Sequence, residues 1–279
     1  MADFLMRDQA PLTAQQWDAL DQTVTEVARR ILVGRRFITV AGPLGAGVQA
    51  IAADTLTGVT PGVTSLIGDE EGDLVRVESR RIIALPIIYK DFRLHWRDVE
   101  ISQQSGMPMD VGPAAAAAAM TARAEDNLIF NGDPSLGFEG LLTVPNRTTV
   151  SRSDWDQAGK AFDDVVAAVS ALTAAGFVGP FAAVLSPRLY ASIHRVYANT
   201  GVLEVEQIRQ LLTDGVYQSV AVPEPTALVI ATGPENMDLA IAQDLTTAFL
   251  QTDNMNHYFR VLEILALRIK RPGAICAIA

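Results

Sequence analysis

Apolar residues near the start of the chain recur at three- and four-residue spacing, which predicts an amphipathic helix of roughly 20 residues. The apolar positions are Trp17, Leu20, Val24, Val27 and Ile31. Thr13 and Gln16 have the spacing of a capping box at the start of this helix, and Gly34 is suited to its end. We expect the apolar stripe to pack in the core, with contact to a second chain or a peptide as the alternative.

A short apolar run at residues 37–40 predicts a strand, and a turn rich in glycine and proline follows it at 42–47. Gly42 and Gly47 have the outer spacing of a Walker A loop. Val48 and Gln49, however, stand where that motif places a lysine and a serine or threonine. The loop therefore lacks the ammonium and the hydroxyl that hold a γ-phosphate and magnesium, and the sequence argues against nucleotide binding.

Residues 51–85 show no helical pattern and mix glycine, threonine and acidic residues with β-branched ones. We expect two strands, near 63–67 and 73–83, around an acidic tip at 68–72. A two-stranded hairpin buries little surface by itself, so this arm is expected to pack on another molecule. Asp69, Glu70 and Glu71 have no histidine or ligand spacing beside them, and we interpret them as a solvated turn rather than a metal site.

Residues 85–100 alternate apolar and polar positions and become helical near His95, which predicts a strand followed by a helix. Tyr89, Phe92 and Trp96 place three aromatic side chains in this segment. We expect His95, beside Trp96, to serve packing or a surface hydrogen bond. The alternative is a flat ligand, such as a flavin, stacked on Trp96.

Residues 113–129 predict a long helix, because Pro113 suits a first turn and six alanines follow it. Alanine lets another backbone approach closely, so this helix is expected to be central and tightly packed. Glu125 and Asp126 lie next to each other late in it. A carboxylate pair can perform acid–base chemistry, but adjacent residues point in different directions on a helix, so catalysis is not the expected role.

The second half of the chain alternates predicted helices and strands. Helices are predicted at 160–175, 187–199 and 204–212, and strands at 181–185, 227–231, 239–242, 258–270 and 274–279. Neither a repeat nor a linker interrupts this pattern. The expected fold class is therefore α+β, with two closely joined lobes and one long arm.

Composition and charge narrow the function classes. Hydrophobic residues make up 49% of the 279 residues, enough for a large core. The formal charge is 22 − 32 = −10, whereas a protein that binds nucleic acid needs a basic surface. The sequence contains no run of ~18 apolar residues, so no membrane span is expected. The N-terminus lacks an apolar signal core, and the single cysteine, Cys276, allows no internal disulfide, which fits a reducing compartment.

The sequence offers no recognisable active site. The three histidines, His95, His194 and His257, do not fall in a metal-ligand pattern. Cys276 stands in an apolar run and is expected to be a buried small residue, and no nucleophile elbow or triad order can be drawn. These observations favour a structural or binding protein over an enzyme.

Short motifs along the chain match a known family in order. In the first half they are Phe4-Leu5, Ala10-Pro11-Leu12-Thr13 with Trp17, Gly34-Arg35-Arg36-Phe37, Gly42-Pro43-Leu44-Gly45, Leu85-Pro86-Ile87, Trp96-Arg97-Asp98, and Glu125-Asp126 with Ile129-Phe130-Asn131-Gly132. Residues 137–141, Gly179-Pro180-Phe181 and Gln243-Asp244-Leu245 continue the series. The ordered set resembles the family 1 encapsulin shell proteins over essentially the whole chain.

Encapsulins resemble the major capsid proteins of tailed double-stranded DNA phages, so the resemblance implies an axial lobe, a peripheral lobe and an extended loop. The implied division is 1–50 for the N-terminal helix and entry to the peripheral lobe, 51–85 for the extended loop, 86–139 for the peripheral lobe, 140–225 for the axial lobe and 226–279 for return strands joining the lobes. The implied function is a structural subunit that assembles, in multiples of sixty, into an icosahedral compartment in the bacterial cytoplasm. A phage-type capsid protein is the alternative; the acidic charge and the N-terminal helix argue against it.

The resemblance also implies that cargo enzymes bind the inner face of the shell through a short C-terminal targeting peptide. The residues expected to form the peptide groove are Val24, Val27, Ala28, Ile31, Arg35, Phe37, Ile38, Asp238 and Ile241. Apolar side chains would take apolar anchors, and Arg35 or Arg36 would hold backbone or acidic groups. The alternative is that both arginines pair within the shell.

Two further expectations follow from the same resemblance. The residues expected to line a pore at the five-fold axis are Tyr197, Asn199, Thr200, Gly201 and Val202. The expected cargo is a ferritin-like iron-storage protein, by similarity of the GPLGAGVQ turn to relatives with that cargo. No cofactor, metal, nucleic acid or membrane is expected, with a flavin at Trp96 as the open alternative.

Overall fold

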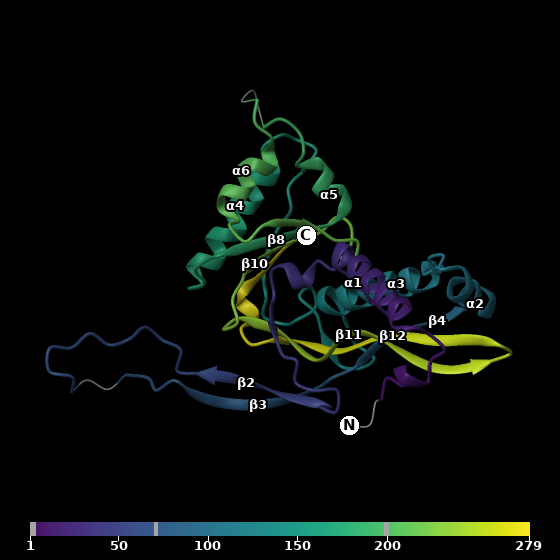
Figure 1. The fold of residues 1–279 in the computed structure, drawn as a ribbon. Coiled ribbons are helices and arrows are strands. Elements are labelled where there is room, and N and C mark those ends of the chain that lie inside the picture. The colour runs from purple at the N-terminus through teal and green to yellow at the C-terminus, as the bar shows by residue number, and fades with distance from the viewer. Residues whose placement is uncertain (1–3, 70–71, 198–200) are drawn as a thin grey trace.

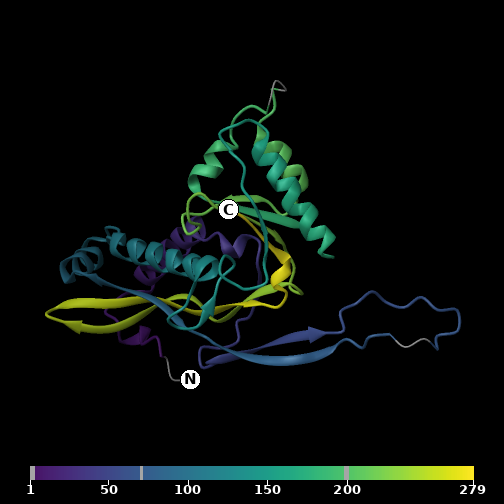
Figure 2. The ribbon, with the colours of Figure 1, turned by 180° about the vertical axis from the view of Figure 1, so that it is seen from behind.

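The computed structural model describes residues 4–69, 72–197 and 201–279. The chain forms two lobes and an arm (Figure 1). A peripheral lobe of sheet and helices lies beside the base of an axial lobe, and a long hairpin extends from that base on the opposite side. The view from behind shows the same three parts (Figure 2).

A four-stranded sheet forms the floor of the peripheral lobe. In sheet order its strands are β1 (Thr39–Ala41), β11 (Met237–Asp253), β12 (Asn256–Ile269) and β4 (Ile87–Leu94). β1 runs parallel to β11, and the other neighbours are antiparallel. The strand predicted at 239–242 is therefore only the apolar beginning of β11, whose pairing with β12 continues through polar residues.

Helices cover one face of this sheet. They are α1 (Ala14–Ile31), α2 (Trp96–Ser105) and α3 (Gly112–Asn131), and a short 3-10 turn, Arg7–Gln9, precedes them. Thr13 closes the predicted capping box with Gln16 at the start of α1. The predicted alanine-rich helix is confirmed: Ala114, Ala117 and Ala118 are at most 2% exposed, because their small side chains let α3 lie close to its neighbours.

A second, five-stranded sheet forms the axial lobe. In sheet order its strands are β7 (Thr148–Val150), β13 (Ile275–Ile278), β10 (Ala227–Ala231), β8 (Phe181–Leu185) and β9 (Val216–Gln218). Helices α4 (Lys160–Ala174), α5 (Pro187–Ser192) and α6 (Glu204–Leu211) pack above it. The segment predicted as return strands, 226–279, is thus divided between the two sheets.

One apolar core continues from lobe to lobe. Phe37, in the turn after α1, lies between Phe130 of α3 and Tyr217 of β9, with ring centroids 6.4 and 6.0 Å away. Two short strands, β5 (Gly132–Asp133) and β6 (Phe138–Glu139), follow α3, and the 3-10 turns η2 (Gly34–Arg36) and η3 (Pro272–Ala274) complete the junction.

The arm is built on β2 (Ala50–Thr57) and β3 (Arg76–Ala84), which pair antiparallel. The prediction of a strand at 63–67 is wrong, since the paired part of the first strand ends at Thr57. Gly58 explains this end. It has a φ of 73°, and a Cβ there would lie 2.2 Å from the carbonyl oxygen of Leu74, so only glycine fits where the chain leaves the ladder.

Gly34 does not end α1 as predicted. Leu32 is the C-cap, and its N–H donates to the carbonyl of Ala28. Gly34 instead begins η2 and lies against α3, where a Cβ would come within 2.6 Å of Ile129 Cδ1. The glycine serves the close approach of the turn to α3 rather than the end of the helix.

The helix predicted at 187–199 is also shorter, because α5 ends at Ser192. Beyond it the chain turns back on itself: Val196 pairs with Leu203, and the N–H of Tyr197 donates to the carbonyl of Val202. The spacing of apolar residues along the sequence does not predict that the chain turns back here.

Two glycines of the arm provide a matched test of these constraints. Gly58→Ala forces a side chain into a left-handed backbone beside Leu74 and is expected to cost at least about 1 kcal/mol and open the end of the hairpin. Limited trypsin digestion of the purified protein should cleave after Arg76 several-fold faster. Gly62→Ala is the control, because nothing lies within 4 Å of its Cβ position; equal cleavage of the two variants would contradict the argument.

Candidate functional site

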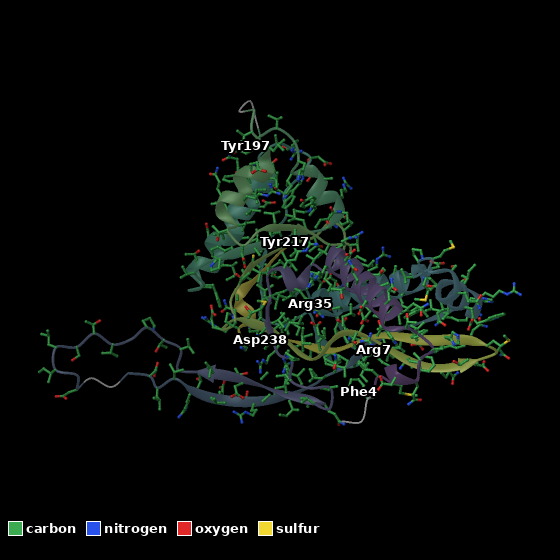
Figure 3. The ribbon with its side chains drawn as sticks, in the orientation of Figure 1. Phe4, Arg7, Arg35, Tyr197, Tyr217 and Asp238 are labelled. Carbon is green, nitrogen blue, oxygen red and sulfur yellow. The ribbon has the colours of Figure 1, made fainter. Side chains whose placement is uncertain are left out.

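The turn between α1 and β1, residues 32–38, lies where the two lobes meet, and Figure 3 shows Arg35 at this junction. The turn carries both arginines of the Gly-Arg-Arg-Phe motif. Its backbone and its side chains are held by different groups.

Three carboxylates surround the guanidinium of Arg35. Nε and Nη2 donate to the two oxygens of Glu125 at 2.7 and 2.8 Å, in the paired geometry that binds arginine most strongly. Nη2 also donates to Glu263 at 2.7 Å and Nη1 to Asp244 at 2.6 Å. Burial lowers the pKa of Arg35, but these carboxylates outweigh it and hold the pKa above its ordinary value. Arg35 thus joins α3, β11 and β12.

Asp126, the neighbour of Glu125, binds the backbone of the same turn. Its carboxylate accepts the N–H groups of Val33 and Gly34, each at 3.0 Å. Burial raises the pKa of Asp126 to about 6, although these two N–H donors act in the opposite direction. The adjacent acids late in α3 are therefore structural: one holds the backbone of the turn and the other its arginine.

Arg36 caps the end of α1. Its Nε donates to the carbonyl of Leu32 at 2.9 Å and its Nη2 to the carbonyl of Arg30 at 3.1 Å. These are carbonyls at the end of a helix, where a cation is favourable. The alternative that both arginines pair within the protein is the one that the contacts support.

Most residues of the predicted peptide groove lie in the interior. Six of the nine are between 2% and 6% exposed: Val24, Ala28, Phe37, Ile38, Asp238 and Ile241. Asp238 binds Arg268 and Lys270 at 2.7 Å. A side chain that is buried in this way offers little surface to a peptide, so the chain as described does not favour these six as peptide contacts. Val27, Ile31 and Arg35 are partly exposed.

A hollow of about 370 Å³ opens beside the exposed end of α1. Its lining comprises Ile31, Val33, Arg123, Asp126, Asn127, Gln218, Ser219, Val220 and Ala221. Val220 is 72% exposed, and Arg123 has no hydrogen bond or ion pair among the described residues. The sequence analysis missed the 218–221 wall, because only the docking of the axial lobe brings it next to α1 and α3.

The glycine-proline turn at 42–47 binds protein rather than phosphate. The N–H groups of Leu44 and Gly45 donate to the carbonyls of Ile241 and Ala242 at 2.9 and 3.0 Å. These donors are therefore not free for an anion, in agreement with the argument against nucleotide binding.

Trp96 begins α2, and His95 caps that helix. The N–H of Arg97 donates to Nδ1 of His95, whose ring stacks on Trp96 at a centroid distance of 6.1 Å. The guanidinium of Arg97 lies 5.4 Å from the Trp96 ring. Packing and a surface hydrogen bond are the roles predicted for His95; a flavin at Trp96 stays a prediction.

Of the predicted pore residues, Tyr197 lies at the far tip of the axial lobe, where Figure 3 labels it. Tyr197 packs edge-on against Phe162 of α4 at 5.8 Å, and Val202 is 38% exposed. Gly201 has a positive φ of 73°. Asn199 and Thr200 lie outside the described residues.

The arm exposes a series of large apolar side chains. They are Leu56, Val59, Val63, Leu66, Ile67, Leu74, Val75, Val77 and Ile82, each at least 49% exposed. Large exposed apolar patches are rare on monomeric proteins, so these side chains are suited to burial against another molecule.

Within residues 4–69, 72–197 and 201–279, no group of three or more histidine, cysteine or acidic residues could hold a metal ion. No helix in these ranges is both long and apolar enough to span a bilayer.

The role assigned to Asp126 is testable by substitution. Asp126→Ala leaves the N–H groups of Val33 and Gly34 unpaired in the interior and is expected to cost about 1–3 kcal/mol for each. The thermal midpoint of the purified protein should fall by several degrees. Asp163→Ala removes an exposed partner of Lys160 and should leave the midpoint nearly unchanged; equal losses would refute the assignment.

Comparison with known proteins finds a family model and relatives that match most of the chain. A family model described as encapsulating protein for peroxidase, Linocin_M18, matches residues 2–266. The type 1 encapsulin shell protein EncA of Myxococcus xanthus is 51% identical over 278 residues, which cover 100% of this chain and 97% of the relative. A diheme-cytochrome-encapsulin shell fusion protein of Kuenenia stuttgartiensis is 41% identical over 96% of this chain and 73% of its own length. A ferritin-like-encapsulin shell fusion protein of Pyrococcus furiosus is 26% identical over 73% of this chain and 55% of its own length.

Solved structures share the fold. A virus-like particle from Pyrococcus furiosus superposes with a TM-score of 0.77 at 20% identity, covering 95% of this chain and 100% of that one. The capsid of Myoviridae phage XM1 gives a TM-score of 0.63 at 11% identity over 86% and 88% of the two chains. The predicted capsid fold of tailed phages is confirmed. Together with the family model and the M. xanthus relative, these likenesses show that the chain belongs to the encapsulin shell proteins.

Proposed function

We propose that this encapsulin shell protein assembles, through its exposed arm, into an icosahedral compartment of sixty copies or a multiple of sixty in the bacterial cytoplasm. We further propose that it captures cargo enzymes in the hollow beside α1. The observation that carries the cargo assignment is the hollow itself, with apolar walls and an unpaired arginine. The capsid-like shell role is common to the encapsulin family.

The arm supports assembly because its exposed apolar residues need a partner. Closed icosahedral shells require head-to-tail contacts around their five-fold axes, in which a projecting element of one subunit meets a different surface of the next. The β2–β3 arm projects beyond both lobes, as such a contact requires (Figure 1). The tip of the axial lobe, which points away from both the arm and the peripheral lobe (Figure 1), would then meet its copies around the five-fold axis and line a pore with Tyr197, Gly201 and Val202.

The hollow suits a short peptide with apolar anchors. Ile31 of α1, with Val220 and Ala221 of the loop after β9, supplies partly or fully exposed apolar side chains to its lining. Val27 precedes Ile31 by one helical turn and extends the partly exposed apolar face of α1. These positions replace the six interior residues of the predicted groove, and they retain Val27 and Ile31 from it.

Arg123 supplies the polar contact that was expected of Arg35. The guanidinium of Arg35 is fully used by Glu125, Glu263 and Asp244, whereas Arg123 is exposed and unpaired among the described residues. A free guanidinium binds a carboxylate or a backbone carbonyl. A targeting peptide at the C-terminus of a cargo protein offers both kinds of group.

The cargo class is proposed as a ferritin-like iron-storage protein. The support is the Pyrococcus furiosus relative, whose name joins a ferritin-like part to an encapsulin shell. The Kuenenia relative joins a diheme cytochrome instead, so a redox protein is the competing cargo. The formal charge of −10 per chain disfavours retention of nucleic acid inside the shell.

The groove proposal predicts that charge at its walls prevents loading. Ile31→Asp, Val220→Asp and Arg123→Glu are each expected to lower the amount of tagged cargo that copurifies with shells by at least about tenfold. A tenfold loss corresponds to about 1.4 kcal/mol of binding free energy, which we expect each added negative charge to cost. Gel densitometry after co-expression measures the ratio of cargo to shell protein.

Thr25→Asp is the control, because Thr25 is exposed on the same helix, outside the lining of the hollow. Electron microscopy of every variant checks that hollow icosahedral particles still form. Normal loading in all three groove variants, with intact particles, would rule out the hollow as the cargo site. Absence of particles for the unmodified protein would refute the assembly proposal instead.

A further inference from the structure

The cluster around Arg35 contains more negative charge than its arginine neutralises. If every group is ionised, three carboxylates face one guanidinium, a net charge of 1 − 3 = −2. The side chains of Glu125 and Glu263 are both 0% exposed, whereas that of Asp244 is 65% exposed. An uncompensated buried charge is unfavourable, so uptake of a proton by one of the two interior carboxyl groups is favourable.

Glu263 is the carboxyl group with an oxygen free to carry a proton. One oxygen accepts from Arg35, while the other, Oε1, is buried without a hydrogen-bond partner among the described residues. The same nitrogen of Arg35, Nη2, binds both Glu125 and Glu263, so the two carboxyl groups lie side by side. A second buried negative charge this close is unfavourable, so protonation of Glu263 relieves the repulsion.

Within the part of the chain that the structure describes, Glu263 forms an ion pair with one cation, Arg35. Arg35 faces it from η2, Glu125 from α3 and Asp244 from β11, while β4 places Ile88 opposite it in the sheet. Burial, followed by the charge of Glu125, raises the pKa of Glu263 well above its ordinary value. Asp126, one residue from Glu125, holds the backbone of the same turn.

We propose that Glu263 carries a proton in the closed subunit and that this proton locks the turn at residues 32–38 onto the sheet. When the turn opens, Glu263 meets water, loses its proton to solvent, and Arg35 leaves the cluster. Rising pH therefore favours the open turn, and the end of α1 with Ile31 opens with it.

The direction of this pH dependence follows from proton linkage. A carboxyl group with a raised pKa in the closed state binds more protons there than in the open state. Closure is then most favourable at low pH and weakens as pH rises from the ordinary value of about 4.5 toward the raised one. The equilibrium constant for opening grows by up to about tenfold for each pH unit in that window.

Hydrogen exchange of intact shells, read by mass spectrometry between pH 5 and 9, measures the opening of segment 32–38 once intrinsic exchange rates are divided out. The opening constant of the unmodified shell should rise with pH. Glu263→Gln keeps the shape and the hydrogen-bond donor of the protonated acid but cannot lose a proton. The opening constant of this variant should therefore rise less steeply with pH than that of the unmodified shell. Asp126 contributes equally to both proteins and cancels in the comparison.

Glu206→Gln, at an exposed ion pair of the axial lobe, is the matched control and should follow the unmodified shell. Identical pH dependence in Glu263→Gln and in the unmodified shell would overturn the proposal. If Glu263→Gln does not assemble, Glu125→Gln gives the same test, since removal of the neighbouring charge should move the pH response to lower pH.

The consequence for cargo rests on the proposed function and has its own measurement. Binding of a synthetic targeting peptide should weaken with rising pH in the unmodified shell and less so in Glu263→Gln. If the turn opens with rising pH but no peptide binds at any pH, the proposal for Glu263 stands and only the groove proposal is refuted.

Discussion

Two adjacent carboxyl groups on α3 hold the turn between α1 and β1, and the placement of the lobes depends on that turn. Side chains of neighbouring residues in a helix point about 100° apart. Asp126 therefore reaches the backbone at Val33 and Gly34, while Glu125 reaches the side chain of Arg35. The turn is fixed in both position and orientation, and Phe37 is directed into the core between Phe130 and Tyr217.

This arrangement explains why the paired arginines are poor candidates for ligand contacts, although the motif suggests them. Arg35 is committed to three carboxylates and Arg36 to helix carbonyls. Release of Arg35 to a ligand would leave Glu125 and Glu263 as unpaired buried groups, a cost that a peptide contact does not offset. A recognition surface next to this junction has to use residues outside the cluster, and Arg123 is one of them.

The sequence predicts the elements whose signals lie in their own residues. The capping box at Thr13, the helical spacing from Trp17 to Ile31 and the apolar runs of β8 and β10 each predict the observed element. Prediction from the sequence fails where distant segments decide the outcome. β2 begins with small residues and has little strand signal of its own, so only its pairing with β3 defines it. The burial of Phe37 and Ile38 depends on Tyr217 and on α3, which no local pattern reveals.

The position of β13 within the axial sheet has a consequence for the order of folding. Residues 275–278 pair with β7 on one side and with β10 on the other, and all four are buried. While a ribosome still holds these residues, β7 and β10 have no strand between them and the sheet is divided. Long-range pairing of this kind forms late, since the intervening chain must first be ordered. A subunit therefore gains a complete axial lobe only after synthesis of this strand, and a chain that lacks it has its axial sheet divided between β7 and β10.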